Sequence, residues 1–224
     1  MKAFKMLLLT FGFLVAAQAK AGFITINESE LDGIFSQSSF ENKPIDIRIG
    51  KATELVFPDL LDITTSNDIT KLFNQHVGIQ KIVNIFFVDT ITYCGGTTGS
   101  NIAGCGEYFG NDFVVNSNFA GSNFGSELLA HELGHNLGLN HNSSQVLMNG
   151  ILNGQTLLES FEVDIIHRLP QSPFQLVQSD DQGFWIDINP VLIVAKASTP
   201  VPEPSTLVLL LLSVGFLVRK NIKK

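Results

Sequence analysis

The chain has 224 residues, with 14 lysines and arginines against 21 aspartates and glutamates, and a formal net charge of −7 at pH 7. This acidic balance argues against a surface that binds nucleic-acid phosphates. The length is enough for one domain with a sizeable core, and the chain has five histidines and two cysteines on which metal or redox chemistry could depend.

Residues 1–21 have the three parts of a secretory signal peptide. Two lysines form a short basic start, an apolar run covers residues 6–17, and small residues recur at alternate positions up to Ala19 and Ala21. The apolar run is too short for a comfortable membrane span. We therefore expect export of the chain, with cleavage after Ala19 or Ala21.

The next part of the chain predicts one strand and one helix. Residues 23–40 are polar and mixed, and we interpret them as an edge segment. Apolar residues alternate within 45–57, which is typical of a strand. Residues 66–80 carry apolar side chains near one face of a helix, with Ser66 or Asn67 as its N-cap.

Two strands and a glycine-rich loop follow. Residues 81–91 are a continuous apolar run, as expected of a strand buried on both faces, and residues 112–116 form a shorter strand. Between them lie the two cysteines, Cys94 and Cys105, among glycines. In an exported chain this pair predicts one disulfide. The alternatives are a free thiol, or a cysteine that would bind a catalytic metal ion and keep a precursor inactive.

One short stretch carries the groups for metal chemistry. On a helix, His131 and His135 lie one turn apart on the same face, with about 5 to 6 Å between their Cβ atoms. Gly138 can end that helix in the left-handed conformation, so the chain can turn back and bring in His141. Three neutral imidazoles with an open fourth position are what a catalytic zinc requires. Glu132, beside the first histidine, is placed to take the proton of a water molecule.

The helix that carries these residues is expected to cover 125–138. Ser122 or Ser126 can cap it, and Glu127 lies in its first turn, where a negative charge suits the helix dipole. On the side opposite the histidines the helix has an apolar stripe. The stripe consists of Leu129, Leu133 and Leu137.

A second amphipathic helix is expected over residues 156–169, ended by Pro170. His167 lies in its last turn, where a cation is favoured, and we interpret it as structural. His76 is expected to be a surface or helix-end residue rather than a metal ligand. Residues 184–194 look like a late strand pair that closes the domain.

The pattern His-Glu-x-x-His-x-x-Gly-x-x-His resembles the zinc signature of the metzincin metalloendopeptidases, and residues 134–138 are most similar to their reprolysin-like (adamalysin-like) branch. That family has a Met-turn under the metal, for which Met148 is the candidate, with ordinary core packing as the alternative. Gly150 stands where astacins and serralysins have an extra tyrosine ligand. Asn142 replaces the aspartate usual in animal reprolysin-like enzymes. The resemblance covers residues 81–150.

The resemblance implies an α+β fold with a mixed twisted sheet, an edge strand that binds substrate, the active-site helix, the Met-turn and a C-terminal helix. The strand just before the active-site helix would pair with an extended peptide, with a purely structural strand as the alternative. Residues 150–154 would form one wall of the pocket that takes the substrate residue after the scissile bond, and Ile151 would make this pocket apolar. The implied substrate contacts on the strand are Phe113, Val114, Val115 and Asn116.

A proline-rich breaker, an almost wholly apolar stretch and a basic end make up residues 198–224. Their order resembles the PEP-CTERM sorting signal of Gram-negative bacteria. The resemblance implies transient anchoring in the inner membrane, cleavage by an exosortase and transfer to the cell surface or extracellular matrix. A plain C-terminal anchor is the alternative. The expected division is a signal peptide at 1–21, a catalytic domain at 22–197 and the sorting signal at 198–224.

Together these features predict an exported zinc metalloendopeptidase, with Zn²⁺ held by His131, His135 and His141 and with Glu132 as general base. We expect a monomer that acts on polypeptides, is processed by signal peptidase and exosortase, touches the membrane through its C-terminal segment and binds no nucleic acid. A cell-surface or biofilm-matrix protein with a non-catalytic zinc site is the alternative. A structural zinc, however, usually has four protein ligands.

Overall fold

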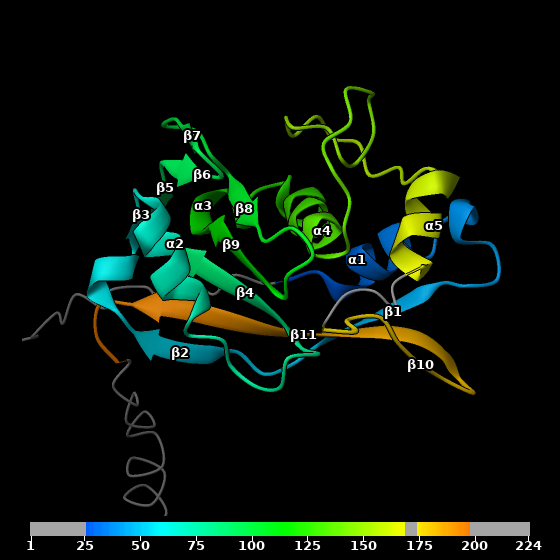
Figure 1. Ribbon diagram of the computed structural model, residues 1–224, viewed down its shortest axis with the longest axis horizontal. Coiled ribbons are helices and arrows are strands. Elements are labelled where there is room, and N and C mark those ends of the chain that lie inside the picture. The colour runs from blue at the N-terminus through cyan, green and yellow to red at the C-terminus, as the bar shows by residue number, and fades with distance from the viewer. Residues whose placement is uncertain (1–25, 169–173, 198–224) are drawn as a thin grey trace, which may run out of the picture.

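The computed structural model describes residues 26–168 and 174–197 (Figure 1). The predicted signal peptide and sorting signal lie outside these ranges. Within them, we find no helix long and apolar enough to cross a membrane. The described residues form the predicted α+β fold around a mixed, mostly parallel sheet.

Seven strands of the described residues form the main sheet: β1 (Ile45–Ile49), β2 (Thr53–Val56), β4 (Val83–Val88), β8 (Gly104–Gly106), β9 (Asp112–Asn116), β10 (Gln178–Asp180) and β11 (Gly183–Val194). Their order is β1-β11-β4-β9-β8, with β2 and β10 also paired to β11. Only β8 and β10 run antiparallel to their neighbours in this sheet. Two further strand pairs are small: β3 (Asp62–Ile63) with β5 (Thr90–Ile91), and β6 (Tyr93–Cys94) with β7 (Thr97–Thr98).

The last strand lies in the middle of the sheet, as Figure 1 shows for the long orange arrow. β1 and then β2 pair along one edge of β11, while β10 and then β4 pair along the other. The prediction of a late strand pair over residues 184–194 is wrong, because these residues form the single central strand β11, whose hairpin partner β10 precedes them. Pro190, which has no N–H, lies next to the break between β1 and β2, where Gly50 donates to the carbonyl of Ile188.

β4 is buried along its whole length, as predicted from its continuous apolar run. Ile85 and Phe87 belong to one core cluster, and Phe86 and Val88 belong to a second one. Because side chains alternate along a strand, these two clusters lie on opposite faces of the sheet. The sheet is therefore covered on both sides.

The helices of the described residues are α1 (Glu28–Phe35), α2 (Ser66–Phe73), α3 (Ser117–Ala120), α4 (Gly125–Asn136) and α5 (Ser160–His167), with 3-10 turns η1 (Ser38–Phe40) and η2 (Pro58–Leu60). The buried leucines, isoleucines and other apolar side chains of α1, α4 and α5 belong to one core cluster, whereas the buried leucine of α2 belongs to the other. The prediction of an edge segment at 23–40 is wrong, because Glu28–Phe35 is a helix capped by Asn27, whose Oδ1 accepts from the N–H of Glu30.

Three other element predictions need correction. The region 45–57 is two strands rather than one. The helix predicted at 66–80 ends at Phe73, and its cap is Thr65, which forms a capping box with Asp68. The helix predicted at 156–169 begins only at Ser160, after Glu159 as N-cap.

β9 has the predicted bounds but is not the edge of the sheet. It pairs with β4 on one side and with β8 on the other. Phe113, Val114 and Val115 are fully buried, and the backbone N–H of Asn116 donates to the carbonyl of Ala103. These residues therefore have no free strand edge to offer a substrate, and the edge position belongs to β8.

Candidate metal centre

The three predicted ligands converge. The Nε2 atom of His141 lies 3.2 Å from the Nε2 atom of His131 and 3.2 Å from that of His135. Among the described residues, this is the one group of three or more metal-binding side chains, with ligand atoms within 4.8 Å of one another. His131 is buried, His135 is half-buried and His141 is exposed, so the group opens to solvent on the side of the third histidine.

Local helix geometry accounts for this convergence. His131 and His135 are four residues apart in α4. Gly138 has φ +85°, and its N–H donates to the carbonyl of His135, while the N–H of Leu139 donates to that of Gly134. This is a left-handed helix end, and it turns the chain back so that His141 faces the helix.

The outer nitrogens of two imidazoles are held by backbone. Nδ1 of His131 lies 2.8 Å from the carbonyl oxygen of Leu147, and Nδ1 of His135 lies 2.8 Å from that of Leu139. Because a carbonyl only accepts hydrogen bonds, each Nδ1 carries the hydrogen and each Nε2 keeps its lone pair. Two lone pairs therefore face Nε2 of His141 at 3.2 Å each, an arrangement that one shared cation would satisfy.

The electrostatics favour neutral imidazoles. Burial, together with the neighbouring His135 and His141, lowers the pKa of His131 to about 4, against the hydrogen bond to Leu147, which raises it. Burial also lowers the pKa of His135. Neutral imidazoles are the form that binds a metal, so the donor set fits a divalent cation such as zinc.

Glu132 lies beside the first ligand and is only 5% exposed. Burial raises the pKa of its carboxyl to about 8, while a backbone hydrogen bond with Gly106 acts in the opposite direction. A cation bound to the imidazoles would favour the ionised carboxylate.

The edge strand β8 packs directly against Glu132. A Cβ atom at Gly104 would lie 2.7 Å from Cδ of Glu132, and one at Gly106 would lie 2.7 Å from the carbonyl oxygen of Glu132. Both separations are shorter than carbon contacts allow, so a side chain at Gly104 would displace the side chain of Glu132, and one at Gly106 would push against the backbone of α4. Sequence reasoning missed them, although two glycines at alternate positions of a strand share one face, which was an available signal.

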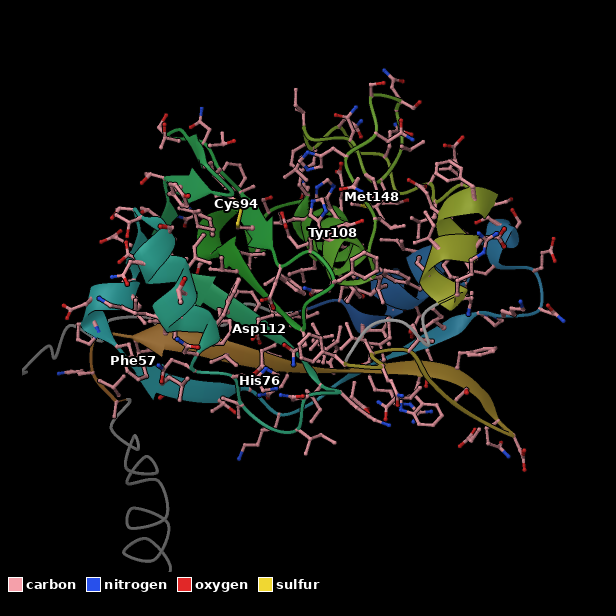
Figure 2. All side chains as sticks on the ribbon, viewed as in Figure 1. Phe57, His76, Cys94, Tyr108, Asp112 and Met148 are labelled. Carbon is pink, nitrogen blue, oxygen red and sulfur yellow. A yellow bond between two sulfur atoms is a disulfide. The ribbon has the colours of Figure 1, made fainter. Side chains whose placement is uncertain are left out.

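The residue between those glycines forms the predicted disulfide. Cys105 is bonded to Cys94 of the β6–β7 hairpin, which confirms the pairing. Because successive side chains of a strand point to opposite faces, the bond ties β8 to the hairpin on the side away from Glu132. Figure 2 shows the bond in yellow beside the label of Cys94.

Met148 lies fully buried beneath the helix that carries the ligands. A Cβ atom at Gly134 would lie 2.5 Å from its sulfur, so the thioether packs against the helix between His131 and His135. The N–H of Asn149 donates to the carbonyl of Val146, which closes a turn around Met148. Met148 therefore packs against the helix that carries two of the ligands, and its role as the Met-turn residue stays a prediction.

A loop after β8 covers the end of α4. The N–H of Phe109 donates to the carbonyl of His135, and the ring of Phe109 lies over Gly138. The neighbouring Tyr108 is half exposed, and its hydroxyl accepts from Nδ2 of Asn140, the residue before His141. The sequence analysis did not identify these two aromatic residues as neighbours of the metal ligands. Figure 2 labels Tyr108.

The predicted caps of α4 are wrong. Phe124 occupies the N-cap position without a side-chain hydrogen bond, whereas Ser126 bonds to Glu30 of α1. Glu127 does lie in the first turn, but it is buried and accepts from the backbone N–H groups of Asn153 and Gly154. Ile151, in the same loop, is 75% exposed.

The remaining histidines lie elsewhere. Nδ1 of His76 lies 2.8 Å from Oδ1 of Asp112, and Figure 2 shows this pair away from Met148. His76 is therefore half-buried and lies just beyond the end of α2, in line with the helix-end alternative of the prediction. Burial raises the pKa of Asp112 to about 6, against its hydrogen bond with His76. His167 contacts the carbonyl of Lys43, in line with a structural role.

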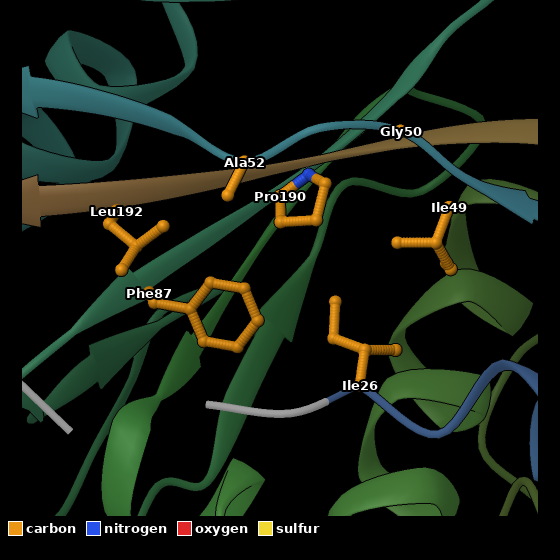
Figure 3. Close-up of a pocket in the computed structure, with 7 residues that line it drawn as sticks. All are labelled: Ile26, Ile49, Gly50, Ala52, Phe87, Pro190 and Leu192. Carbon is orange, nitrogen blue, oxygen red and sulfur yellow. The ribbon is translucent and has the colours of Figure 1, made fainter. Parts of the chain in front are cut away.

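An apolar cavity of about 200 Å³ lies next to β11, and Figure 3 shows its lining. None of its side chains can titrate or bind a metal. They are Ile26, Ile49, Gly50, Ala52, Phe87, Pro190 and Leu192. None of the three histidines lines this cavity, so it is not part of the candidate metal centre.

Comparison with known protein families gives a match. The family described as metallo-peptidase family M12B, reprolysin-like, matches residues 31–142, which is 112 of the 224 residues. The match includes all three histidines and Glu132 and ends before Met148. No curated protein matches the chain.

Proposed function

Because the chain belongs to the reprolysin-like M12B metallopeptidase family, we propose that it is an exported zinc endopeptidase with Glu132 as its general base. Membership in the family and the three-histidine cluster suggest a metalloprotease. One observation carries the finer proposal. Three imidazole Nε2 atoms converge on one point, with a buried carboxylate on the adjacent helix residue.

His131, His135 and His141 would hold the metal through Nε2. Bound zinc supplies a Lewis acid for the scissile carbonyl and for a water molecule. The backbone carbonyls of Leu147 and Leu139 keep two of the imidazoles in the tautomer that binds a cation. Zinc is proposed on the basis of the family, because an all-imidazole ligand set also suits other divalent ions.

Glu132 would act as the general base. Its carboxylate accepts the proton of the attacking water and then delivers it to the leaving amine. The packing of Gly104 and Gly106 against it limits the positions that the carboxylate can take. A base held in one place is what such a transfer requires.

The edge strand β8 is the proposed docking site for substrate. It ends the sheet, and its glycines lie against Glu132. An extended peptide that paired with its free edge would therefore pass Glu132 and the three histidines. This assignment moves the proposed backbone contacts from Phe113–Asn116 to β8, one strand further out.

Export is supported by the signal-peptide pattern of residues 1–21 and by the disulfide, because disulfides persist in oxidising compartments. The PEP-CTERM-like segment supports transient anchoring in the inner membrane and exosortase processing, followed by display at the cell surface or in the extracellular matrix. The substrate would be a polypeptide, and the protein would act as a monomer.

A test of the peptidase proposal is digestion of a mixed peptide library by the zinc-loaded protein, with and without a chelator. We expect cleavage that the chelator abolishes and that zinc restores. Glu132→Gln should keep one zinc per chain and lose at least about two orders of magnitude in rate. A wild-type protein that binds one zinc and cleaves no peptide would favour a non-catalytic matrix protein instead.

A further inference from the structure

Glu127 is a buried carboxylate that the proposed reaction does not use. It lies in the first turn of α4, one helical turn before His131, and is 5% exposed. No ion pair within the described residues includes it. A buried charge must be compensated by hydrogen bonds or by a cation, so its partners indicate its role.

Those partners are two consecutive backbone amides. The N–H of Asn153 donates to one carboxylate oxygen over 2.8 Å, and the N–H of Gly154 donates to the other over 2.9 Å. Gly154 has φ +77°, a conformation that allows successive N–H groups to point at one anion. Within the loop, Oδ1 of Asn153 also accepts from the N–H of Gln155.

The loop that Glu127 holds begins at the metal centre. A Cβ atom at Gly150 would lie 3.2 Å from Nδ1 of His141, so the start of the loop touches the third ligand. Before it, the carbonyl of Leu147 bonds to His131 and Met148 packs on Gly134. The chain therefore returns along α4 from the ligands toward the first turn of the helix.

The two ends of the loop are thus fixed, and the side chain at its tip is exposed. Gly150 contacts His141, and Asn153 and Gly154 are bonded to α4, while Ile151 between them is 75% exposed. The N–H of Ile151 donates to Oδ1 of Asn149, and Leu152 packs against the main core cluster. The two hydrogen bonds to Glu127 fix the far end of the loop, and the position of the exposed isoleucine depends on them together with these nearer contacts.

We infer that Glu127 is a positioning residue for substrate specificity: it fixes the loop 150–155, which forms the wall beside the metal and selects the side chain next to the scissile bond. This inference rests on the proposed peptidase function. Glutamine cannot replace the carboxylate, because its NH₂ group would face one of the two N–H donors and leave that donor unpaired.

The test compares wild type, Glu127→Gln and a matched control, Ser126→Ala. The control removes the hydrogen bond between α4 and Glu30 without touching the loop. Each zinc-loaded protein is given two peptides that differ only in the residue after the scissile bond, leucine or alanine. The measured quantity is the ratio of the two kcat/KM values.

We expect Glu127→Gln to keep one zinc per chain and to move this ratio about tenfold toward one, the scale on which an apolar pocket discriminates. Ser126→Ala should keep the wild-type ratio. A folded, zinc-loaded Glu127→Gln protein with the wild-type ratio would overturn the inference. Should that variant fail to fold, Ile151→Ala changes only the exposed tip, and an unchanged ratio there would equally overturn it.

A second measurement separates this inference from the peptidase proposal. Amide hydrogen exchange at Asn153 and Gly154 should become faster in Glu127→Gln and stay as in wild type in Ser126→Ala. If wild type cleaves no peptide, the peptidase proposal fails and with it the specificity role. Unchanged exchange in Glu127→Gln would show in either case that Glu127 does not hold the loop.

Discussion

The contact between β8 and the proposed base allows a sharp test in Gly104→Ala. The new Cβ atom would lie 2.7 Å from Cδ and 2.8 Å from Cγ of Glu132. Ordinary carbon contacts begin at about 3.5 Å, so the carboxyl group must move by about 1 Å. The displaced atoms belong to a side chain, and the three imidazoles are not touched. We therefore expect a misplaced base in an otherwise intact metal centre.

A displacement of about 1 Å in a catalytic group can reduce the rate about 100-fold, which corresponds to about 3 kcal/mol in the activation barrier. The assay is the initial rate of peptide cleavage together with the zinc content of the same sample. We expect Gly104→Ala to keep one zinc per chain and to lose activity on this scale.

Two neighbouring variants complete the comparison. Gly99→Ala, in the same loop region, adds a Cβ atom with nothing within 4 Å and should behave as wild type. Gly106→Ala would place Cβ 2.7 Å from the carbonyl oxygen of Glu132 and 2.9 Å from Cβ of His135, so strand and helix must separate and zinc binding should weaken. Full activity in Gly104→Ala would refute the proposed packing of β8 on the base.

Three further predictions concern stability. Replacing Cys94 and Cys105 by serine should lower the unfolding free energy by about 3 kcal/mol in denaturant titrations, through a less constrained unfolded chain; an unchanged midpoint would contradict this. Gly138→Ala should lower it by about 1–3 kcal/mol, since alanine is strained at φ +85° and would meet the ring above it; an unaltered melting temperature would count against that geometry. Burial raises the pKa of Asp112 in the folded state from 3.8 to about 6. The protonated carboxyl group therefore adds to the unfolding free energy in full below pH 3.8, and this stabilisation, up to about 3 kcal/mol, is lost as the pH rises through 6. Asp112→Asn should remove this component of the pH dependence, so equal profiles for both proteins would disprove it.

The metal ligands could be predicted because their geometry is local. The spacing of His131 and His135 follows from the helix period, and Gly138 indicates where the chain turns. β4 was predictable for a similar reason, because six consecutive apolar or amide residues are buried on both faces. Such features need no knowledge of distant parts of the chain.

The edge strand could not be predicted in the same way. β8 consists of Gly104, Cys105 and Gly106, which have little intrinsic preference for a strand, and it forms because β9 and Glu132 lie beside it. The central place of β11 was hidden by Pro190, which usually indicates an edge strand. The anchor at Glu127 depends on a loop that lies 26 residues away in sequence.

The first helix was missed despite a local signal. Asn27 followed by Glu30 is an N-cap pattern, but Gly33 inside the helix weakens the prediction. The true caps of α2 and α4 lie outside the residues chosen from the sequence, because neighbouring serines and threonines compete for the same role and only the backbone path decides among them.

The central position of β11 has a consequence for how the sheet can assemble. β1, β2 and β4 emerge from the ribosome long before Gly183–Val194, yet none of them pairs with another in the described residues until that strand arrives between them. A nascent chain can already pair β4 with β9 and β9 with β8, the two strands against which α4 packs. β1 and β2 can join this part of the sheet only once synthesis has passed Val194, so a prematurely terminated chain would leave both strands without the neighbour they pair with.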